Sequence, residues 1–463
     1  MKKYLATFSM AILSSSVMAS IPIYQPIGSS TVLGGYANRQ SLITSLANPA
    51  APYLMTNIES FRVGFLGPLS FGYEMGEINN LDDKIDELEA ILEKDYSASF
   101  NGLSNADLVS LGLTVNSTDE EISAALLQSN AEVAAAINQA DGIIAEIGDT
   151  AYVKFSGALQ APFMPIIYKT RNRGAFILDA SASFVGQVGI ISDNISASVS
   201  GSDIELGSDT AVYVKRATDY RFGLGYSQVV GRPVSGALIL GGRVNIHNIA
   251  LNKKLSILTD ESDDADDGFG DFLLERKNVE TGVSLDLGAI WAAPNYQLGA
   301  SLANVNEPEF DFGELGNCSG LSGSDLTSCN AAIRLSDEGK LELKETYKMK
   351  SQLTLDAAVM STNQNWSLAG SYDVNSVADP VGDKYQWKVI SLSYFSDNLL
   401  FPGVRVGYRK NHAGSKLSYA TVGATLFRRL DFDLAYGLEK FSDGDGGTLP
   451  RSLYFSVGYG FAF

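Results

Sequence analysis

The side chains that most often perform chemistry in proteins are sparse in this sequence. It contains two histidines, His247 and His412, which are far apart in the chain. Neither has the serine and aspartate spacing of a hydrolase or the ligand spacing of a metal site. The acidic stretch 260–268 resembles a calcium-binding loop, but a loop starting at Asp263 has alanine and leucine at ligand positions three and twelve. The sequence therefore predicts no enzyme, no bound metal and no cofactor.

Charged side chains instead recur on one face of predicted β-strands. In residues 430–440, Asp431, Asp433 and Glu439 alternate with large apolar residues. The same alternation in other strands adds further charges of both signs. Such a set more often forms a solvated, mutually paired lining than a catalytic site. The residues predicted to line an interior are Asp286, Asp356, Arg405, Arg409, Asp431, Asp433 and Glu439.

The elements that must position these charges are strands with one oily face. The last stretch, 451–463, alternates apolar residues with Ser, Gly and Ala, and it ends on an aromatic residue. In a transmembrane barrel the apolar face of such a strand meets lipid, and pairing of the last strand with the first removes the exposed edge. A soluble sandwich also has alternating strands, and it remains an alternative. The predicted C-terminal barrel signal is Phe455, Val457, Tyr459, Phe461 and Phe463.

The N-terminus and the composition favour the barrel. Residues 1–19 have two lysines, a short apolar run and small residues before a cleavage site after Ala19, as a secretory signal does. No later apolar run is long enough for a membrane-spanning helix, which leaves a closed barrel as the spanning architecture. The net charge of −19 argues against nucleic acid as a partner. We therefore expect an exported protein of a Gram-negative outer membrane, with lipid, lipopolysaccharide and the barrel-assembly machinery as partners.

Two cysteines lie close together in the chain. Cys318 and Cys329 enclose a short polar loop. Exported chains fold in an oxidising compartment, so a disulfide is expected. The distant histidines make a zinc pair improbable.

The chain divides into five predicted parts. After the signal, residues 20–56 are irregular or partly inserted, and residues 57–78 suggest a β-hairpin around Gly67-Pro68. Residues 79–149 carry two helical patterns, Leu81 to Leu92 and Thr118 to about Ile147. This insertion either packs on itself, caps the barrel or binds a partner. Residues 150–463 have the period of two expected for the barrel.

Connections between the predicted strands alternate in length. Outer-membrane barrels have long external loops and short periplasmic turns, and bacterial ones have an even number of strands. The pattern predicts an all-β antiparallel barrel of about fourteen strands, with one exception, a tight turn at 217–218 on the long-loop side. The long set is 250–278, 305–345, 375–384, 411–416 and 441–450, and the short set is 231–235, 293–294, 361–363, 397–400 and 428–429.

Several stretches together resemble a known family. They are Leu33-Gly34-Gly35-Tyr36-Ala37, Ala47-Asn48-Pro49-Ala50, the acidic helix 81–92 and the strand pair 282–308. In order and spacing they resemble the FadL-type outer-membrane transporters for hydrophobic molecules, and most of all the TraF-like proteins named for plasmid conjugal transfer. The resemblance implies a fourteen-stranded barrel with passive uptake, whose N-terminal segment, residues 20–56, plugs the lumen. Asn48, Pro49 and Ala50 correspond to the family's signature near the plug.

Two functions from different classes remain open. The first is passive uptake of small hydrophobic molecules through the barrel. The second is a structural or assembly role in an envelope or conjugal-transfer apparatus, with helices 79–149 as the docking surface. An outer-membrane phospholipase or protease is a minor alternative, because no catalytic spacing supports it.

Overall fold

The structure is a computed structural model that describes most of the mature chain. The predicted signal, Phe463, the acidic stretch 260–268 and most of 95–130 lie outside the described residues. No helix among the described residues is both long and apolar enough to cross a membrane. The described residues are 22–56, 60–77, 81–92, 94, 121, 131–200, 203–233, 235–258, 276–396, 403–427, 429–442 and 447–461.

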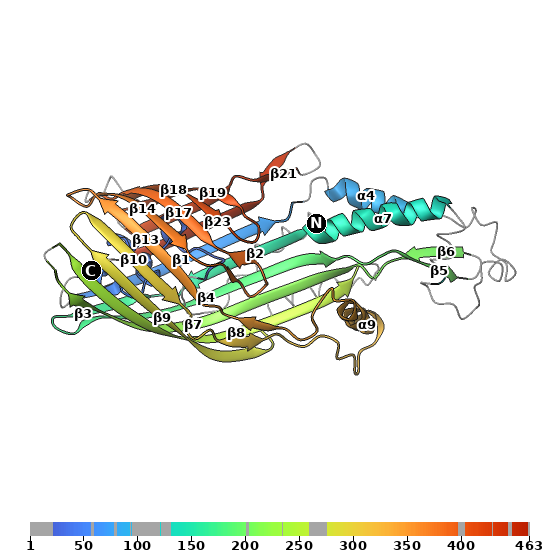
Figure 1. The fold of residues 1–463 in the computed structure, drawn as a ribbon, viewed down its shortest axis with the longest axis horizontal. Helices are drawn as coiled ribbons and strands as arrows, with labels where there is room; N and C mark the ends of the chain where they lie inside the picture. Colours follow the sequence, from blue (N-terminus) through green and yellow to red (C-terminus); the bar gives the residue numbers. More distant parts are fainter. Residues whose placement is uncertain are drawn as a thin grey trace.

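One antiparallel sheet closes on itself to form a barrel (Figure 1). The first strand pairs with the last, and two short strands, β2 and β3, lie end to end between β1 and β4. They share one place, so the barrel has fourteen strand positions, which confirms the predicted number. In order around the barrel the strands are β1 (Ser60–Met75), β2 (Tyr152–Gln160) with β3 (Ile166–Thr170), β4 (Gly174–Ile191), β7 (Ala211–Gly231), β8 (Ala237–Ile257), β9 (Val279–Ala292), β10 (Tyr296–Ala303), β13 (Gln352–Met360), β14 (Trp366–Asp373), β17 (Trp387–Tyr394), β18 (Gly403–Asn411), β19 (Ser418–Leu426), β20 (Leu430–Gly437) and β23 (Ser452–Phe461).

The wall has its oily face outward. In β17, Ile390 and Leu392 are 55% and 42% exposed, whereas Ser391 and Ser393 are 2% and 1% exposed. A soluble sandwich would bury the branched apolar residues and expose the serines. In β23, Phe455 is likewise exposed, and its neighbours Tyr454 and Ser456 are buried. The outward apolar surface is therefore the surface that lipid covers.

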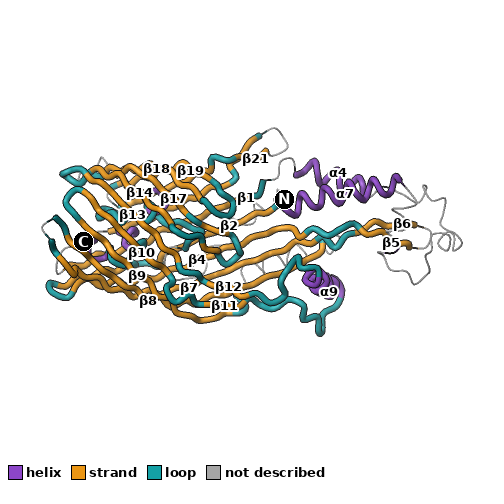
Figure 2. Tube along the Cα trace, viewed as in Figure 1, coloured by secondary structure: helices purple, strands orange, loops and turns teal. Residues whose placement is uncertain are grey.

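The two ends of the barrel differ as predicted. At one end the turns are short, such as 171–173 and 293–295; we call it the short-turn end. At the other, the long-loop end, the connections carry helices and small hairpins, and Figure 2 shows α4, α7 and α9 at this end beside the extended strands. The predicted turn at 217–218 is wrong, because β7 runs without a break from Ala211 to Gly231 and pairs with β4 and β8 on its two sides.

The predicted hairpin at 57–78 is also wrong. Residues Ser60–Met75 form one strand, and the barrel therefore begins at residue 60 rather than 150. Gly67-Pro68 does not turn the chain. Instead the register between β1 and β23 shifts between Gly64 and Leu66 and between Leu66 and Leu69. Such bulges accommodate a proline that cannot donate to the ladder.

The helical insertion is the connection between β1 and β2, at the long-loop end. Helix α4 (Leu81–Leu92) and helix α7 (Ala131–Thr150) pack antiparallel, and apolar residues of α7 face Leu88 and Ile91 of α4. An ion pair of 2.7 Å between Lys94 and Glu132 links them. The predicted second helix starts at Thr118, but of its residues before 131 the structure describes only residue 121.

A third helix at the long-loop end, α9 (Gly323–Asp337), belongs to the β10–β13 connection. It packs on the extension of β8 through Ala331, Ala332 and Leu335. The predicted disulfide between Cys318 and Cys329 is present, with a Cα–Cα distance of 5.7 Å. Small two-stranded sheets complete the loops: β5 (Ser196–Ser200) with β6 (Asp203–Gly207), β11 (Glu309–Asp311) with β12 (Thr346–Lys348), β15 (Val377–Ala378) with β16 (Lys384–Tyr385), and β21 (Lys440–Ser442) with β22 (Thr448–Pro450).

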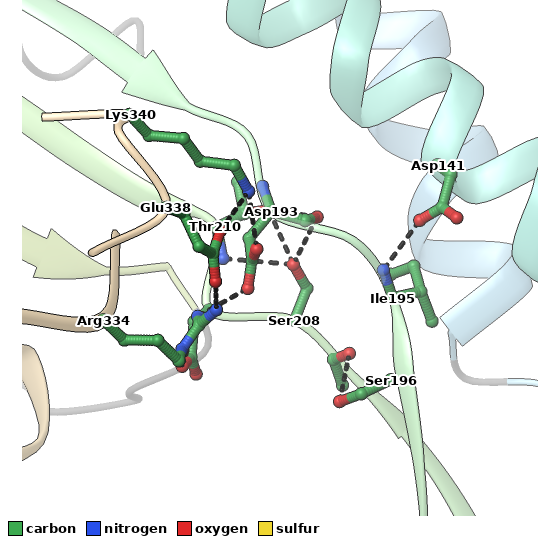
Figure 3. Close-up of polar contacts among 11 residues, drawn as sticks. Asp141, Asp193, Ile195, Ser196, Ser208, Thr210, Arg334, Glu338 and Lys340 are labelled. Atoms are coloured by element: carbon green, nitrogen blue, oxygen red, sulfur yellow. Dashed lines mark hydrogen bonds and ion pairs between the residues drawn. The ribbon is translucent and has the colours of Figure 1, made fainter. Parts of the chain in front are cut away.

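A polar cluster fixes α9 to the β4–β7 connection (Figure 3). Arg334 donates to Asp193 at 2.6 Å, and Lys340 donates to the other oxygen of Asp193 at 2.8 Å. Partial burial of Asp193 opposes its ionisation, but these two hydrogen bonds outweigh that effect and hold its pKa below the ordinary range. In the same connection, the backbone N–H of Ile195 donates to Asp141 of α7 at 2.7 Å. Three long connections are thereby joined above the barrel.

Candidate functional site in the barrel lumen

The N-terminal segment, residues 22–56, fills the lumen. Its short helix α2 (Ser30–Leu33) contacts β14, β17, β18, β19 and β20, and α3 (Pro52–Met55) contacts β3, β4 and β7 on another part of the wall. A third element, the 3-10 helix η1 (Leu42–Leu46), contacts β1. Polar residues of the segment, such as Gln25 and Thr44, are completely buried. The segment therefore lies inside the barrel and is enclosed by it.

Asn48, Pro49 and Ala50 lie against strands β8, β9 and β10. The side-chain amide of Asn48 donates to the backbone carbonyls of Ala300 at 3.1 Å and Ala289 at 3.4 Å. The side-chain oxygen of Asn48 accepts a 2.9 Å hydrogen bond from the N–H of Ala50, which closes a tight turn over Pro49. This three-residue turn therefore binds carbonyls of β9 and β10 through the side chain of Asn48.

Two wall glycines make this approach possible. A Cβ atom at Gly241 would lie 2.1 Å from the carbonyl oxygen of Pro49. One at Gly288 would lie 2.2 Å from the side-chain oxygen of Asn48. Both distances are too short for any Cβ contact, so only glycine admits the segment's backbone at these two positions.

The lumen charges form two networks. In the first, Arg405 is fully buried and donates through Nε and Nη2 to both oxygens of Asp433, at 2.6 and 2.7 Å, and to Asp431 at 3.3 Å. In the second, Arg243 donates to Asp286 at 3.0 and 3.1 Å and to the carbonyl of Leu46 at 3.0 Å. The second network therefore also holds the N-terminal segment.

Other predicted lining residues are not in these networks. Glu439 accepts a 2.9 Å hydrogen bond from the N–H of Ser418 at the end of the wall. Asp356 is 6% exposed and Arg409 is 4% exposed, and neither has an ion-pair partner among the described residues. Mutual pairing thus accounts for Asp286, Arg405, Asp431 and Asp433 but not for these two buried charges.

One group of hydrogen-bonded residues, centred on His247, was not expected from the residue spacing in the sequence. His247 lies 2.7 Å from Asp219 through Nδ1 and 2.9 Å from Ser284 through Nε2. The three residues come from neighbouring strands, which is why their sequence separations gave no signal. Ser284 is fully buried and also accepts a 3.0 Å hydrogen bond from Asn245. Because its oxygen is already satisfied and is shielded from water, the set carries no argument for a nucleophile.

An aromatic cluster closes the long-loop side of the lumen. It combines Tyr24 of the N-terminal segment with loop residues and with inward residues of the wall. Beside it, Lys154 of β2 forms an ion pair of 2.9 Å with Asp379, which lies in the β14–β17 connection. The buried aromatic members are Tyr24, Phe310, Phe312, Tyr347, Tyr385, Trp387, Tyr419 and Tyr454.

The strand position shared by β2 and β3 has a break at residues 161–165, but Ala161, Phe163 and Pro165 still make backbone hydrogen bonds to β4 or β1 there. A cavity of about 40 Å³ lies there, between the break, β1 and the N-terminal segment. It is lined by Ile43, Met164 and Pro165 among others. A space of this size holds roughly one water molecule.

The chain is similar to one protein family and to several solved structures. A family model described as "F plasmid transfer operon, TraF, protein" matches residues 45–373. No curated protein matches the chain. Among solved structures, a FadL homologue from Pseudomonas aeruginosa is 11% identical, with a TM-score of 0.36 over 97% of this chain and 100% of that one. An outer-membrane phospholipase A from Escherichia coli is 12% identical, with a TM-score of 0.24 over 89% and 97% of the two chains.

Proposed function

This chain belongs to the family of the F plasmid transfer operon protein TraF, and on that premise we propose that it takes up small hydrophobic molecules passively across the outer membrane. The observation that carries the proposal is a lumen filled by a separate N-terminal segment. That segment is not an element of the wall, and Asn48 holds it through two neutral hydrogen bonds to wall carbonyls. Each such bond contributes only about 0.5–1.5 kcal/mol, so displacing this turn is energetically feasible.

The proposed route begins at the long-loop end. By the usual orientation of outer-membrane barrels, this end faces outward and the short-turn end faces the periplasm. A hydrophobic molecule enters past the aromatic cluster and displaces the N-terminal segment. It leaves inward, or sideways at the strand break at 161–165. In this proposal Asn48, Pro49 and Ala50 act as the plug motif.

Uptake of a hydrophobic dye by cells tests this proposal. Intact outer membranes exclude N-phenyl-1-naphthylamine, which fluoresces once it enters the membrane interior. We expect cells with the wild-type protein to take up the dye faster than cells without it, and Pro49→Gly to change that rate severalfold because it loosens the turn. Gly242→Ala is the matched control, since its added Cβ would have nothing closer than 3.8 Å. The proposal fails if wild type, Pro49→Gly and empty cells take up every hydrophobic compound at one rate.

Export and assembly are also proposals. We propose that the signal is cleaved after Ala19 and that the barrel-assembly machinery reads the last strand. The apolar residues Phe455, Val457 and Tyr459 alternate with buried ones in β23, as such a recognition strand requires. Mass spectrometry of the mature N-terminus, and the yield of heat-modifiable barrel after deletion of Phe463, test the two statements separately.

A second candidate function is assembly with an envelope apparatus, and the α4–α7 pair favours it. The pair lies at the long-loop end, where α7 contacts β4 and α4 packs on α7 (Figure 1). Its outer residues include the exposed carboxylates Glu87, Glu89 and Glu132. Deleting 79–149 should abolish crosslinking to a partner while the barrel still folds. Crosslinks that survive the deletion count against a docking role.

A further inference from the structure

Arg409 is a buried cation that forms no ion pair with any carboxylate of the described residues. It lies on β18, is 4% exposed, and no carboxylate of the described residues is within ion-pair distance. Its Nη1 donates to the carbonyl of Thr31 at 3.2 Å, and its Nε has no hydrogen-bond partner. Four residues earlier on the same strand, Arg405 binds Asp433 through two nitrogens. A buried charge is unfavourable unless it is paired and hydrogen-bonded, and the described part of the chain leaves Arg409 with a free Nε and no direct ion pair.

One carboxylate, Asp373, acts electrostatically on Arg409, but its oxygens bind other groups. Asp373 accepts hydrogen bonds from the N–H of Trp387 at 2.8 Å, from Thr354 at 2.6 Å and from Gln352 at 3.2 Å. These bonds fix its oxygens along the β13–β14–β17 ladder. Asp373 therefore attracts the Arg409 guanidinium through space but forms no ion pair with it.

Aromatic rings surround the guanidinium. Arg409 stacks on Trp387, with its central carbon 3.9 Å from the ring centroid. The rings continue as a row, with centroid distances of 5.6 Å from Tyr385 to Trp387, 5.9 Å from Trp387 to Tyr419 and 5.5 Å from Tyr419 to Tyr454. Arg409 is also the direct ladder partner of Tyr419. The row therefore offers ring faces and edges beside a cation.

The N-terminal segment now occupies this place. The carbonyl of Thr31 accepts from Arg409, and the carbonyl of Ile23 accepts a 3.0 Å hydrogen bond from the indole N–H of Trp387. Both acceptors are neutral. A carboxylate makes hydrogen bonds to a guanidinium about twice as strong as a neutral acceptor does, and it can engage two nitrogens at once.

We propose that Arg409 and the row Tyr385, Trp387, Tyr419 and Tyr454 bind a planar aromatic carboxylate once the N-terminal segment is displaced. The carboxylate pairs with the guanidinium, and the ring inserts along the aromatic row. The inference rests on the proposed uptake function, for which it names the substrate class.

Binding of matched probes to the full-length protein in detergent tests this proposal. The probes are 1-naphthoate and its neutral analogue 1-naphthalenemethanol, each titrated to equilibrium. Binding is followed by the fluorescence emission of Trp387. The spectrum of Trp387→Phe gives the background from the other two tryptophans. We expect wild type to bind the acid at least tenfold more tightly than the alcohol. Arg409→Gln should abolish that preference, and Arg409→Lys should keep a weaker one. Lys410→Gln, which removes a cation from the opposite face of the same strand, should leave it unchanged.

Three results overturn the proposal: equal affinity for acid and alcohol, an acid preference that survives Arg409→Gln in folded protein, or no binding of either probe. Heat-modifiable mobility on a gel shows whether each variant is folded. If Arg409→Gln does not fold, the acid preference of Arg409→Lys is compared with that of wild type instead. Failure of the proposed binding site can be distinguished from failure of the proposed uptake function. Acid binding that depends on Arg409 without any dye uptake supports the site and refutes transport, whereas dye uptake without acid preference does the reverse.

Discussion

The contact between Gly241 and the Asn48–Ala50 turn gives the most decisive prediction about the lumen. In Gly241→Ala the new Cβ would meet the carbonyl oxygen of Pro49 at 2.1 Å and the nitrogen of Ala50 at 2.6 Å. Backbone atoms cannot rotate aside, so the turn must retreat by about 1 Å to reach ordinary contact. The Asn48 hydrogen bonds to the wall are already 3.1 and 3.4 Å long, and such a movement breaks them.

The magnitude follows from those two bonds. At about 0.5–1.5 kcal/mol each, their loss weakens the seated state of the segment by about 1–3 kcal/mol. The population of the displaced state then rises by roughly 5-fold to 150-fold. We expect Gly241→Ala to raise the open probability in planar bilayers, and the rate of dye uptake by cells, within that range.

Gly242→Ala supplies the control for this prediction. The residue is next in β8 and faces the other way, and its added Cβ would have no neighbour closer than 3.8 Å. The two variants add the same atoms to the same strand, so they share any effect on β-propensity. If their conductance and uptake rates are indistinguishable, the turn does not hold the segment in place and the reasoning is refuted.

Three further predictions concern the rest of the molecule. Arg405→Gln leaves Asp433 buried without its partner and should lower the free energy of unfolding by about 3–5 kcal/mol, measured by urea titration in detergent; an unchanged midpoint would contradict it. The lowered pKa of Asp193 means that its bonds to Arg334 stabilise the loop cluster above the unfolded pKa of about 3.9 and are lost as the pH falls through the lower folded value. Amide exchange of α9, corrected for intrinsic rates, should therefore rise on going from pH 6 to pH 3 in wild type but not in Asp193→Asn. Reduction of the disulfide should increase exchange in the residues before α9 and leave barrel strands protected, because α9 has its own apolar contacts with β8.

The barrel was predictable where lipid imposes a simple rule. From Gly223 onward β7 alternates strictly between buried and exposed residues, and its sequence gave the correct strand. Between residues 211 and 222 the alternation disappears, and there a turn was wrongly predicted. Strands β4, β7 and β8 extend towards the long-loop end, where α9 and other connections cover them. Protein rather than lipid contacts these faces, so the period-two signal is lost.

The strand β1 shows a second limit. Gly67-Pro68 has the composition of a turn, and a turn was expected. The pairing of β1 with β23 on one side and β2 on the other keeps it extended, with bulges in the register. Local propensity was overridden by pairing partners that are distant in the chain, most of all β23, which is hundreds of residues away.

By itself, the sequence determined the closed barrel, its fourteen positions, the alternating lengths of its connections and the disulfide, because each follows from the solvent a side chain meets or from short spacing along the chain. Only the tertiary structure decided which lumen charges pair. Asp433 reaches Arg405 and His247 reaches Asp219 because strand register places them together. Register also left Arg409 beside aromatic rings and without an ion pair to any described carboxylate. That outcome depends on the positions of several strands at once, which no single stretch of sequence encodes.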